Sequence, residues 1–290
     1  MKGVFSPILR YNPAPMQQVT VIIPALNEEK AIGSVLEGIA ALKIDTSVIV
    51  VDDGSTDSTG EIARSKGVRV LRHPAPLGYG KSMKDALLAI DGDVVIIVDA
   101  DGTYPIDRIP DFLACLEQGY DMVVGARQGK EYHGSFFKKP ARKIFQLLAE
   151  FTTGQRIPDV NSGMRAFHRR AAVQFFPDLC NGFSFTTTIT LVYLLNGKSI
   201  AYLPISYAER VGRSKVRMFH DSLRTLQYLT EAIIHHNPLK LFLLLTITTL
   251  LLGIFGMTWF GVSSLWSGLF NAILVCSMGL IAESMRRPRQ

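Results

Sequence analysis

Cysteine is scarce in this chain, and its placement excludes two kinds of site. Among 290 residues there are three cysteines, at positions 115, 180 and 276, with no Cys-x-x-Cys pair. Scattered cysteines argue against a disulfide framework and a zinc–thiolate site, and they favour a reducing compartment. No secretory signal is visible either, because residues 1–18 contain three prolines and no apolar run of adequate length.

Charge is missing from one long stretch near the C-terminus. From Leu241 to Ala282 no residue is charged, and Ser, Thr, Asn and Gly are the interruptions. One membrane crossing takes roughly 20 helical residues. The stretch therefore predicts two spans, at 239–260 and 265–283, joined by a tight turn at the sequence GVSS. The alternative is a hairpin buried in a soluble core, although soluble helices rarely lack a polar face for so long.

Basic residues flank this uncharged stretch on both sides. Those before it are Arg210, Arg213, Lys215, Arg217, Arg224 and Lys240, and those after it are Arg286, Arg287 and Arg289. Two crossings return the chain to its starting side, so the positive-inside rule places the bulk of the chain and its C-terminus in the cytoplasm. The net charge of +6 favours an anionic partner such as phosphate, nucleic acid or a membrane face.

Strand-like and helix-like segments alternate over residues 19–125. Strands are expected at VTVIIPA, SVIVVDD, GVRVLRH, DVVIIVDAD and DMVVGAR, with helices over 28–42, 56–66, 81–90 and 106–118. Apolar strands separated by helices predict an α/β fold with a mainly parallel sheet covered on both faces. Ligands of such sheets bind beyond the carboxyl ends of the strands. Polar side chains occupy those ends here.

The fourth expected strand ends in two carboxylates, Asp99 and Asp101, in the sequence VDADGTYP. Side chains at i and i+2 of a strand point the same way, so both carboxylates can face one point. Each carboxylate raises the pKa of the other unless a cation lies between them. Carboxylate oxygens without a nearby His or Cys suit Mg²⁺ or Mn²⁺, which bridge to phosphates. The pair therefore predicts a metal-held nucleotide diphosphate; the alternative is that it caps a turn.

Five motifs carry a resemblance to a known family. They are VIIPALNEE, VVDDGSTD, GYGKS, VDADGTYP and NSGMRAF, and in this order they resemble the family 2 glycosyltransferases of the nucleotide-diphospho-sugar (GT-A) fold. The helix and two-span anchor that follow narrow the resemblance to the polyprenyl-phosphate glycosyltransferases, the group of dolichol-phosphate mannose synthase and the bacterial undecaprenyl-phosphate sugar transferases. The resemblance covers residues 18–260. It implies a membrane-bound enzyme that moves a hexose from a UDP- or GDP-sugar to polyprenyl phosphate with inversion.

The resemblance also implies roles for single residues. Metal on the diphosphate would be held by the catalytic pair Asp99 and Asp101, with Thr103 as a further ligand where relatives often carry an amide. The nucleotide would be bound by Pro24, Ala25, Asn27, Glu29, Asp52, Asp53, Gly78, Gly80 and Lys81. The acceptor phosphate would be faced by the catalytic Arg127 and by Lys138, Lys139, Arg142, Ser162, Arg165, Arg213 and Lys215.

The chemistry of the acceptor limits what the protein must do. A phosphate monoester is already largely anionic at pH 7. It therefore needs positioning by cations more than a general base. Asp159 is a conceivable base, but on this argument it orients other groups.

The expected layout has five parts. They are an N-terminal extension (1–18), the GT-A catalytic domain (19–212), an amphipathic juxtamembrane helix (213–237), a two-helix transmembrane anchor (238–284) and a basic cytoplasmic tail (285–290). The juxtamembrane helix is predicted because apolar residues recur every three or four positions from Val216 to Ile233. The same pattern also fits a helix packed on the domain core.

Other functions fit the sequence less well. GYGKS lacks the earlier glycine of a phosphate loop, since Ala75 stands there, and the first strand is not followed by the GxGxxG of a dehydrogenase. Both tryptophans, Trp259 and Trp266, lie in the membrane segment, so the Gln-x-x-Arg-Trp motif of processive synthases is missing. No nucleic-acid motif is recognised. A membrane-tethered nucleotide-sugar binding protein, a different lipid or glycan acceptor, and homo-oligomerisation stay open.

Overall fold

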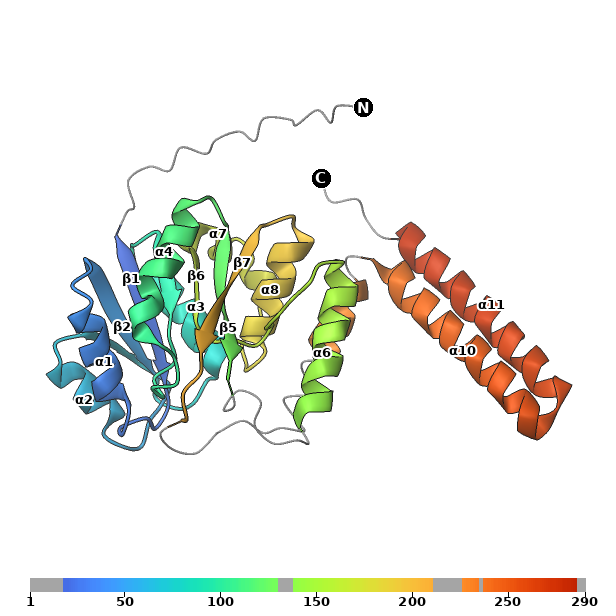
Figure 1. The fold of residues 1–290 in the computed structure, drawn as a ribbon, viewed down its shortest axis with the longest axis horizontal. Coiled ribbons are helices and arrows are strands. Elements are labelled where there is room, and N and C mark those ends of the chain that lie inside the picture. The colour runs from blue at the N-terminus through green and yellow to red at the C-terminus, as the bar shows by residue number, and fades with distance from the viewer. Residues whose placement is uncertain (1–17, 130–137, 211–225, 235–236, 286–290) are drawn as a thin grey trace, which may run out of the picture. The chain divides into compact units, whose positions relative to one another are not determined.

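The structure, a computed structural model, describes residues 18–129, 138–210, 226–234 and 237–285 (Figure 1). Its strands are β1 (Val19–Ala25), β2 (Thr46–Asp52), β3 (Arg69–Arg72), β4 (Val94–Ile97), β5 (Met122–Gln128), β6 (Arg165–His168) and β7 (Ile200–Ser206). Its helices are α1 (Ile32–Ala41), α2 (Thr59–Ser65), α3 (Tyr79–Ala89), α4 (Ile109–Glu117), α6 (Lys138–Thr153), α7 (Arg169–Val173), α8 (Phe185–Leu195), α10 (Pro238–Phe260) and α11 (Val262–Met285), with short 3₁₀ turns η1 (Ile106–Arg108) and η2 (Phe176–Asp178).

The strands form one seven-stranded sheet in the order β3-β2-β1-β4-β6-β5-β7. Neighbours pair in parallel except at β6, which is antiparallel to both β4 and β5. The predicted α/β fold with a mainly parallel sheet is therefore confirmed. Two strands were not predicted. β6 is short and carries a charged residue, and β7 contains Pro204, which lacks an N–H and suits the edge position that β7 has.

Several predicted element boundaries were wrong. β4 ends at Ile97, so Asp99 and Asp101 lie in the loop beyond the strand and not within it. The first helix begins at Ile32, because the residues before it form a turn in which the amide of Ala31 donates to the carbonyl of Glu28. Both differences lengthen the loops at the carboxyl ends of the strands.

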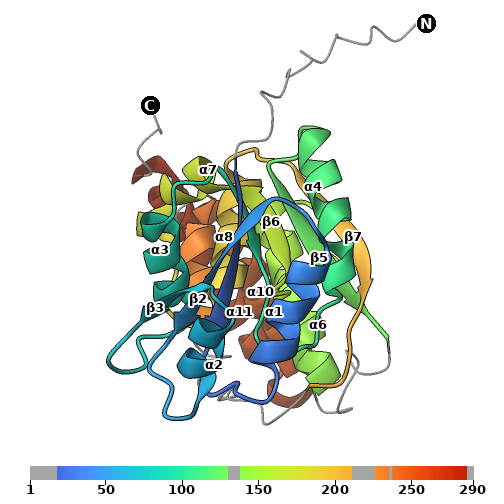
Figure 2. The same ribbon diagram turned by 90° about the vertical axis from the view of Figure 1, so that its left-hand side faces the viewer.

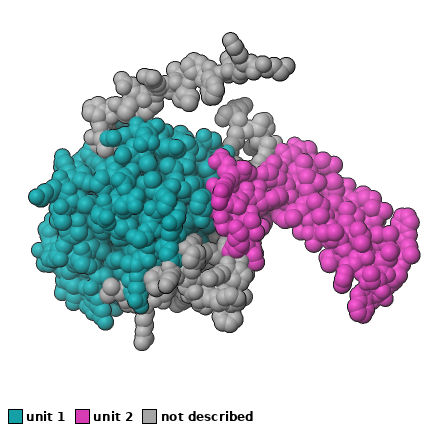
Figure 3. Space-filling view, viewed as in Figure 1, with its two compact units in different colours: residues 1–142, 158–216 teal, residues 143–157, 217–290 magenta. Residues whose placement is uncertain are grey.

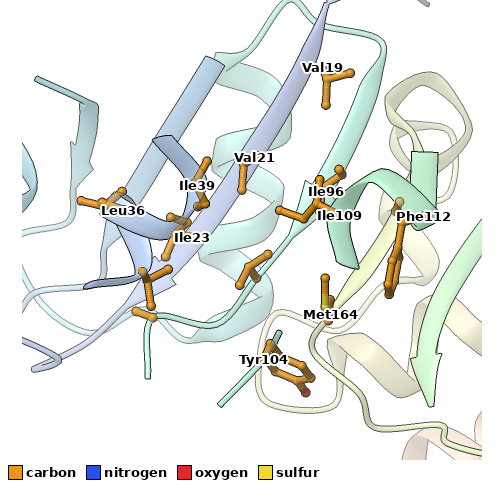
Figure 4. Packing of buried hydrophobic residues seen from close by; sticks show 14 of the residues in the cluster. Val19, Val21, Ile23, Leu36, Ile39, Ile96, Tyr104, Ile109, Phe112 and Met164 are labelled. Atoms are coloured by element: carbon orange, nitrogen blue, oxygen red, sulfur yellow. The ribbon is translucent and has the colours of Figure 1, made fainter. Parts of the chain in front are cut away.

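Helices cover both faces of the sheet (Figures 1 and 2). On one face Val21 and Ile23 of β1 lie in a buried cluster with Ile39 of α1 and with Ile109 and Phe112 of α4 (Figure 4). On the other face the cluster is formed by β1, β2 and β4 with α3 and α8, and it includes Ile22, Ile97, Met83, Leu87, Phe185 and Ile189. Because alternate residues of β1 enter opposite clusters, the strand is buried on both sides.

The chain divides into two compact units (Figure 3). One comprises residues 1–142 and 158–216, and the other comprises residues 143–157 and 217–290. The first contains the sheet, and the second contains most of α6 together with α10 and α11. Within the second unit, Lys240 at the start of α10 donates from Nζ to the carbonyl oxygens of Phe151 (3.1 Å) and Thr152 (3.4 Å). The ammonium group thereby caps the C-terminal carbonyls of α6.

Helices α10 and α11 are each long and apolar enough to cross a membrane. They join at Gly261, and they touch where Gly253 faces Gly268, since a Cβ added to Gly253 would lie 2.8 Å from the Cα of Gly268. The expected pair of candidate spans is therefore present, with the second beginning at Val262 rather than 265.

Part of the predicted juxtamembrane helix falls within the described residues. Residues 226–234 are helical, with Leu229 and Ile233 buried and Leu226 and Ile234 exposed. The rest of the predicted helix up to residue 225 lies outside the described residues.

Candidate active site

The register of the sheet brings several loops to one edge. Ala25 at the end of β1 pairs with Asp52 at the end of β2, and beyond β4 the amide of Val98 donates to the carbonyl of Ile22. Because β6 runs antiparallel, its first residue, Arg165, pairs with Ile97 at the end of β4. The loop that precedes β6 therefore reaches the same edge as the loops that follow the parallel strands.

Asp99 is partly exposed as a residue, but one of its two carboxylate oxygens is not. This oxygen, Oδ1, is buried without a hydrogen-bond partner among the described residues. The loop before β6 lies directly on this carboxylate, since a Cβ added to Gly163 would be 2.5 Å from Oδ2. Burial, followed by the charge of Asp101, raises the pKa of Asp99 to about 7. A bound cation would relieve both effects.

Asp101 is 4% exposed and is held by its own loop. Its Oδ1 accepts hydrogen bonds from the amide (3.1 Å) and the hydroxyl (2.6 Å) of Thr103. This arrangement gives Thr103 a role in orienting Asp101, while its predicted role as a metal ligand stays a prediction. The other oxygen, Oδ2, lies 3.5 Å from Nε of Arg210.

The donor set fits Mg²⁺ or Mn²⁺. A buried carboxylate oxygen without a partner beside a second carboxylate is what a hard divalent cation requires. Within the described ranges, no group of three or more His, Cys, Asp or Glu side chains gathers to form a metal site, at this edge or elsewhere. The protein would therefore supply two carboxylates, and water and diphosphate oxygens would complete the coordination.

Arg210 and Glu28 belong to the site and were missed. Nη2 of Arg210 donates to Oε1 of Glu28 at 2.5 Å, so this arginine bridges Glu28 and Asp101. In the sequence, Arg210 was counted among the basic residues before the spans. Recognition of β7 would have revealed its position, because Arg210 follows the end of that parallel strand at Ser206.

Arg127, at the end of β5, is fixed by Asp159. Its Nε and Nη2 donate to the two oxygens of Asp159 at 2.7 and 2.9 Å, a bidentate pair. Its guanidinium carbon also lies 5.3 Å from the centre of the Tyr207 ring. Asp159 is buried, and both its oxygens are occupied by Arg127. This geometry favours an orienting role for Asp159 over a role as general base.

The loops after β1 and β2 are tied to each other. Asn27 has a left-handed backbone conformation, with φ 49°. Its side-chain oxygen accepts a hydrogen bond from the backbone amide of Thr56 at 2.8 Å, and its backbone amide donates to the hydroxyl of Ser55. Glu29 accepts from the amide of Ser58 at 3.2 Å. Pro24 and Ala25 are the last residues of β1. These four predicted nucleotide-binding residues, Pro24, Ala25, Asn27 and Glu29, therefore lie close together in the fold.

Asp52 and Asp53 serve the protein's own backbone in this structure. Asp52 is fully buried, and its Oδ1 accepts from the amide of Ser55. Asp53 accepts from the amides of Leu77 and Gly78, both at 2.9 Å, and pairs with His73 at 2.8 Å. Their predicted contact with base or ribose stays a prediction. In the structure, the hydrogen bonds of both carboxylates fix the conformation of neighbouring loops.

The start of α3 is likewise occupied by other parts of the chain. The amides of Gly80 and Lys81 donate to the carbonyls of Gly182 and Asn181. The ammonium group of Lys81 pairs with Asp85 at 2.5 Å. Gly78 takes a positive φ of 104° as it enters the helix. These residues hold two loops together, and their predicted contact with the nucleotide stays a prediction.

Arg165 is enclosed by the protein itself, and its predicted contact with an acceptor phosphate stays a prediction. Arg165 is 0% exposed, and its guanidinium donates to the carbonyls of Ser162 and Thr186 and to the hydroxyl of Thr190. The side chain is enclosed because β6 lies between β4 and β5 and because the guanidinium reaches Thr186 and Thr190 of α8. Arg165 thereby fixes the loop before β6, in which Ser162 is also buried and its Oγ has no partner among the described residues.

The other predicted acceptor residues with long basic side chains lie in or beside segments whose side chains are outside the described part of the structure. Lys138, Lys139 and Arg142 belong to the first turns of α6, but their side chains are not described. Arg213 and Lys215 lie outside the described residues. All five stay predictions.

A mainly parallel sheet with paired carboxylates at its carboxyl edge is the arrangement expected of a nucleotide-diphospho-sugar transferase. Comparison with known proteins agrees, because the profile of Glycosyl transferase family 2 matches residues 20–176, more than half of the chain. The chain belongs to glycosyl transferase family 2. The predicted family is confirmed, and the protein is a glycosyltransferase.

Two curated relatives are informative. The dolichyl-phosphate hexose transferase of Haloferax volcanii is 36% identical over 202 residues, which are 69% of this chain and 87% of the relative. The undecaprenyl-phosphate 4-deoxy-4-formamido-L-arabinose transferase of Klebsiella pneumoniae is 28% identical over 302 residues, with 94% and 89% covered.

A solved structure shares the fold. Glucosyl-3-phosphoglycerate synthase of Mycobacterium tuberculosis, crystallised with Mn²⁺, UDP and glucosyl-3-phosphoglycerate, superposes with a TM-score of 0.60 at 23% identity, covering 74% of this chain and 80% of that one. The predicted GT-A fold is thereby confirmed.

Proposed function

We propose that this protein transfers a hexose from a UDP- or GDP-sugar to a polyprenyl phosphate, with inversion at the anomeric carbon. The observation that carries the proposal is one edge of the sheet where Asp99 and Asp101 lie with Arg127 and Arg210. Carboxylates suit a metal-bound diphosphate, and guanidinium groups suit a second phosphate. Both curated relatives are named for lipid-phosphate acceptors, and α10 and α11 would hold the enzyme in the membrane where such acceptors reside.

A divalent cation fits this proposal. Asp99 and Asp101 would hold Mg²⁺ or Mn²⁺, with Thr103 orienting Asp101. When bound, the ion stabilises the negative charge that develops on the departing nucleotide diphosphate. The related synthase with the same fold was crystallised with Mn²⁺ or Mg²⁺ together with UDP.

The chain's own residues then have three tasks. The loops carrying Asn27 and Glu29 bind the nucleoside. Arg127, kept in orientation by Asp159, binds the acceptor phosphate so that one of its oxygens faces the anomeric carbon. That oxygen forms a bond to the anomeric carbon while the bond from this carbon to the nucleotide's β-phosphate oxygen breaks. Because the attacking phosphate is already anionic at pH 7, no proton needs to be removed.

The proposed location is a membrane with the catalytic domain and the C-terminus in the cytoplasm. The two apolar helices bring the chain back to its starting side, and basic residues flank both ends of the pair. The positive-inside rule assigns that side to the cytoplasm. Protease protection of a C-terminal tag in sealed inverted vesicles tests this orientation, and a tag that is protected there would contradict it.

The decisive experiment is a panel of radiolabelled UDP- and GDP-sugars offered with a short polyprenyl phosphate and Mg²⁺ or Mn²⁺. The proposal expects label in the organic phase and release of nucleoside diphosphate. Omission of the lipid phosphate is the control. Tight binding of a nucleotide sugar without any release would instead indicate a tethered binding protein. Release only with a different lipid or glycan would show another acceptor.

A further inference from the structure

The loop before β6, residues 159–163, touches two parts of the site. At one end Asp159 holds Arg127 through the bidentate pair described above. At the other end Gly163 lies against the carboxylate of Asp99 so closely that a Cβ would not fit between them. A group that fixes this loop therefore fixes a proposed metal ligand and a proposed acceptor-binding arginine together.

Tyr104 fixes the end of this loop that carries Gly163. The tyrosine is 4% exposed, and its hydroxyl oxygen accepts a hydrogen bond from the backbone amide of Gly163 at 2.7 Å. Its ring belongs to the buried cluster that also contains Met164 (Figure 4). A buried amide that loses its only partner is costly, so the position of the phenol determines where this amide lies.

The ring of Tyr104 also reaches Arg127 by a second route. It meets the ring of Tyr207 edge-on, with the ring centroids 5.4 Å apart. The guanidinium carbon of Arg127 lies 5.3 Å from the centre of the same Tyr207 ring. The backbone beside Tyr207 is itself held in place, because the amide of Ala208 donates to the carbonyl of Thr103 at 3.0 Å. One hydrogen-bonded route and one aromatic route therefore lead from this tyrosine to the arginine.

We propose that Tyr104 is a positioning residue that sets the separation between Asp99 and Arg127 and so aligns the acceptor phosphate with the donor. The inference rests on the proposed function. Tyrosine fits this place because one side chain supplies both an accepting oxygen for the loop and an aromatic ring for Tyr207. Loss of alignment slows the reaction step more than it weakens binding, because each substrate keeps its own contacts.

Tyr104→Phe tests the proposal, since it keeps the ring and removes the accepting oxygen. We expect kcat for transfer to lipid phosphate to fall roughly 10- to 100-fold, while KM for each substrate stays within about twofold. Tyr193→Phe is the matched control. Tyr193 is also fully buried, but its hydroxyl has no partner among the described residues, and its ring lies in the cluster on the other face of the sheet. Equal kcat values for the two variants would overturn the proposal.

Calorimetric binding of Mn²⁺ to the protein without substrates gives a readout that is independent of turnover. Tyr104→Phe frees Gly163 from its place against Asp99, so Mn²⁺ affinity should weaken roughly tenfold, the lower end for residues that support a metal ligand. Tyr207→Leu interrupts the aromatic route alone. It should leave Mn²⁺ affinity unchanged while kcat falls roughly 3- to 10-fold. Unchanged Mn²⁺ affinity in Tyr104→Phe, or equal weakening in both variants, would overturn the proposal.

Thermal midpoints and a wild-type assay separate this inference from other failures. If Tyr104→Phe does not fold, the half-buried Tyr207 carries the test, and an unchanged kcat of Tyr207→Leu would overturn the proposal. If the wild type transfers no sugar to lipid phosphate, the proposed function fails. The Mn²⁺ affinities of Tyr104→Phe and Tyr193→Phe then still decide whether Tyr104 supports Asp99, and equal affinities would overturn that link as well.

Discussion

The two sides of the edge that carries Asp99 and Asp101 are held mainly by different kinds of bond. On the side of β1 to β4, carboxylate and amide side chains accept from backbone amides, as Asp53 does from Gly78 and Asn27 from Thr56. On the side of β5 to β7, guanidinium groups pair with carboxylates: Arg127 pairs with Asp159, and Arg210 reaches across to Glu28 in the loop after β1. Backbone contacts are fixed by the fold, whereas an arginine can exchange a carboxylate for a phosphate. Under the proposed function, the first side would form the nucleoside pocket and the second would meet the arriving phosphates.

The largest effect is expected from Asp101→Asn, which removes one charge where the two sides meet. Metal stabilisation of a leaving group contributes several kcal/mol, so turnover should fall roughly 10²- to 10⁴-fold. The change is isosteric, and an unaltered thermal midpoint is the control for folding. Metal-dependent turnover at the wild-type level would rule out a metal role for Asp101.

Arg127→Ala is expected to affect the acceptor more than the donor. Loss of a charged hydrogen bond costs about 1.5–3 kcal/mol, so kcat/KM for lipid phosphate should fall roughly 10- to 100-fold. Nucleotide-sugar affinity, measured by calorimetry, should stay within about twofold. Arg127→Lys keeps the charge but loses the bidentate geometry and should give an intermediate rate. A change in nucleotide affinity alone would show that Arg127 does not bind the acceptor.

Asp53→Asn tests the opposite side. In Asp53, the two carboxylate oxygens accept one hydrogen bond each from the backbone amides of Leu77 and Gly78. The side chain of asparagine has a single accepting oxygen, so at least one of these amides loses its partner. The free energy of unfolding should fall by about 1–3 kcal/mol. Nucleotide affinity should weaken while KM for lipid phosphate is unchanged. A selective rise in that KM would contradict the division between the two sides.

The pKa of Asp99 predicts how metal binding depends on pH. Burial and Asp101 raise this pKa to about 7, so below it a proton must leave before a cation binds. Apparent affinity for Mn²⁺ should therefore rise about tenfold per pH unit up to about pH 7 and then level off. Since the folded pKa exceeds the unfolded one, stability of the metal-free protein should fall as pH rises between about 4 and about 7. Calorimetry across this range checks the affinity; a flat profile would refute the assignment.

The smallest effect is a change in Mn²⁺ affinity, which is expected from Arg210→Gln in the absence of nucleotide. The guanidinium lies 3.5 Å from Asp101 and opposes a cation placed there. Its removal should tighten Mn²⁺ binding about threefold, since a part-exposed charge pair contributes under about 1 kcal/mol. Arg108→Gln, which breaks an exposed pair with Asp111 and leaves Asp101 untouched, is the matched control. Weaker Mn²⁺ binding by Arg210→Gln would mean that Arg210 supports the metal site.

Much of the fold could be predicted because its signals are local. Apolar runs ending in polar or charged residues identified the first five strands and their shared edge, and the uncharged stretch identified α10 and α11. Strands β6 and β7 could not be predicted in this way. The four residues of β6 include Arg165, whose burial depends on acceptors in α8 that are distant in sequence. Without β7, nothing in the sequence placed Arg210 beside Asp101.

Contact between Gly163 and the carboxylate of Asp99 offers an uncharged means of adjusting catalysis. The added Cβ of Gly163→Ala would push directly on an oxygen proposed to hold the metal, 2.5 Å away, without altering any ionisable group. Substitutions of increasing size at this single position would displace one ligand by graded steps. Measuring the turnover rate of each variant would then show how strongly the rate depends on the position of that ligand.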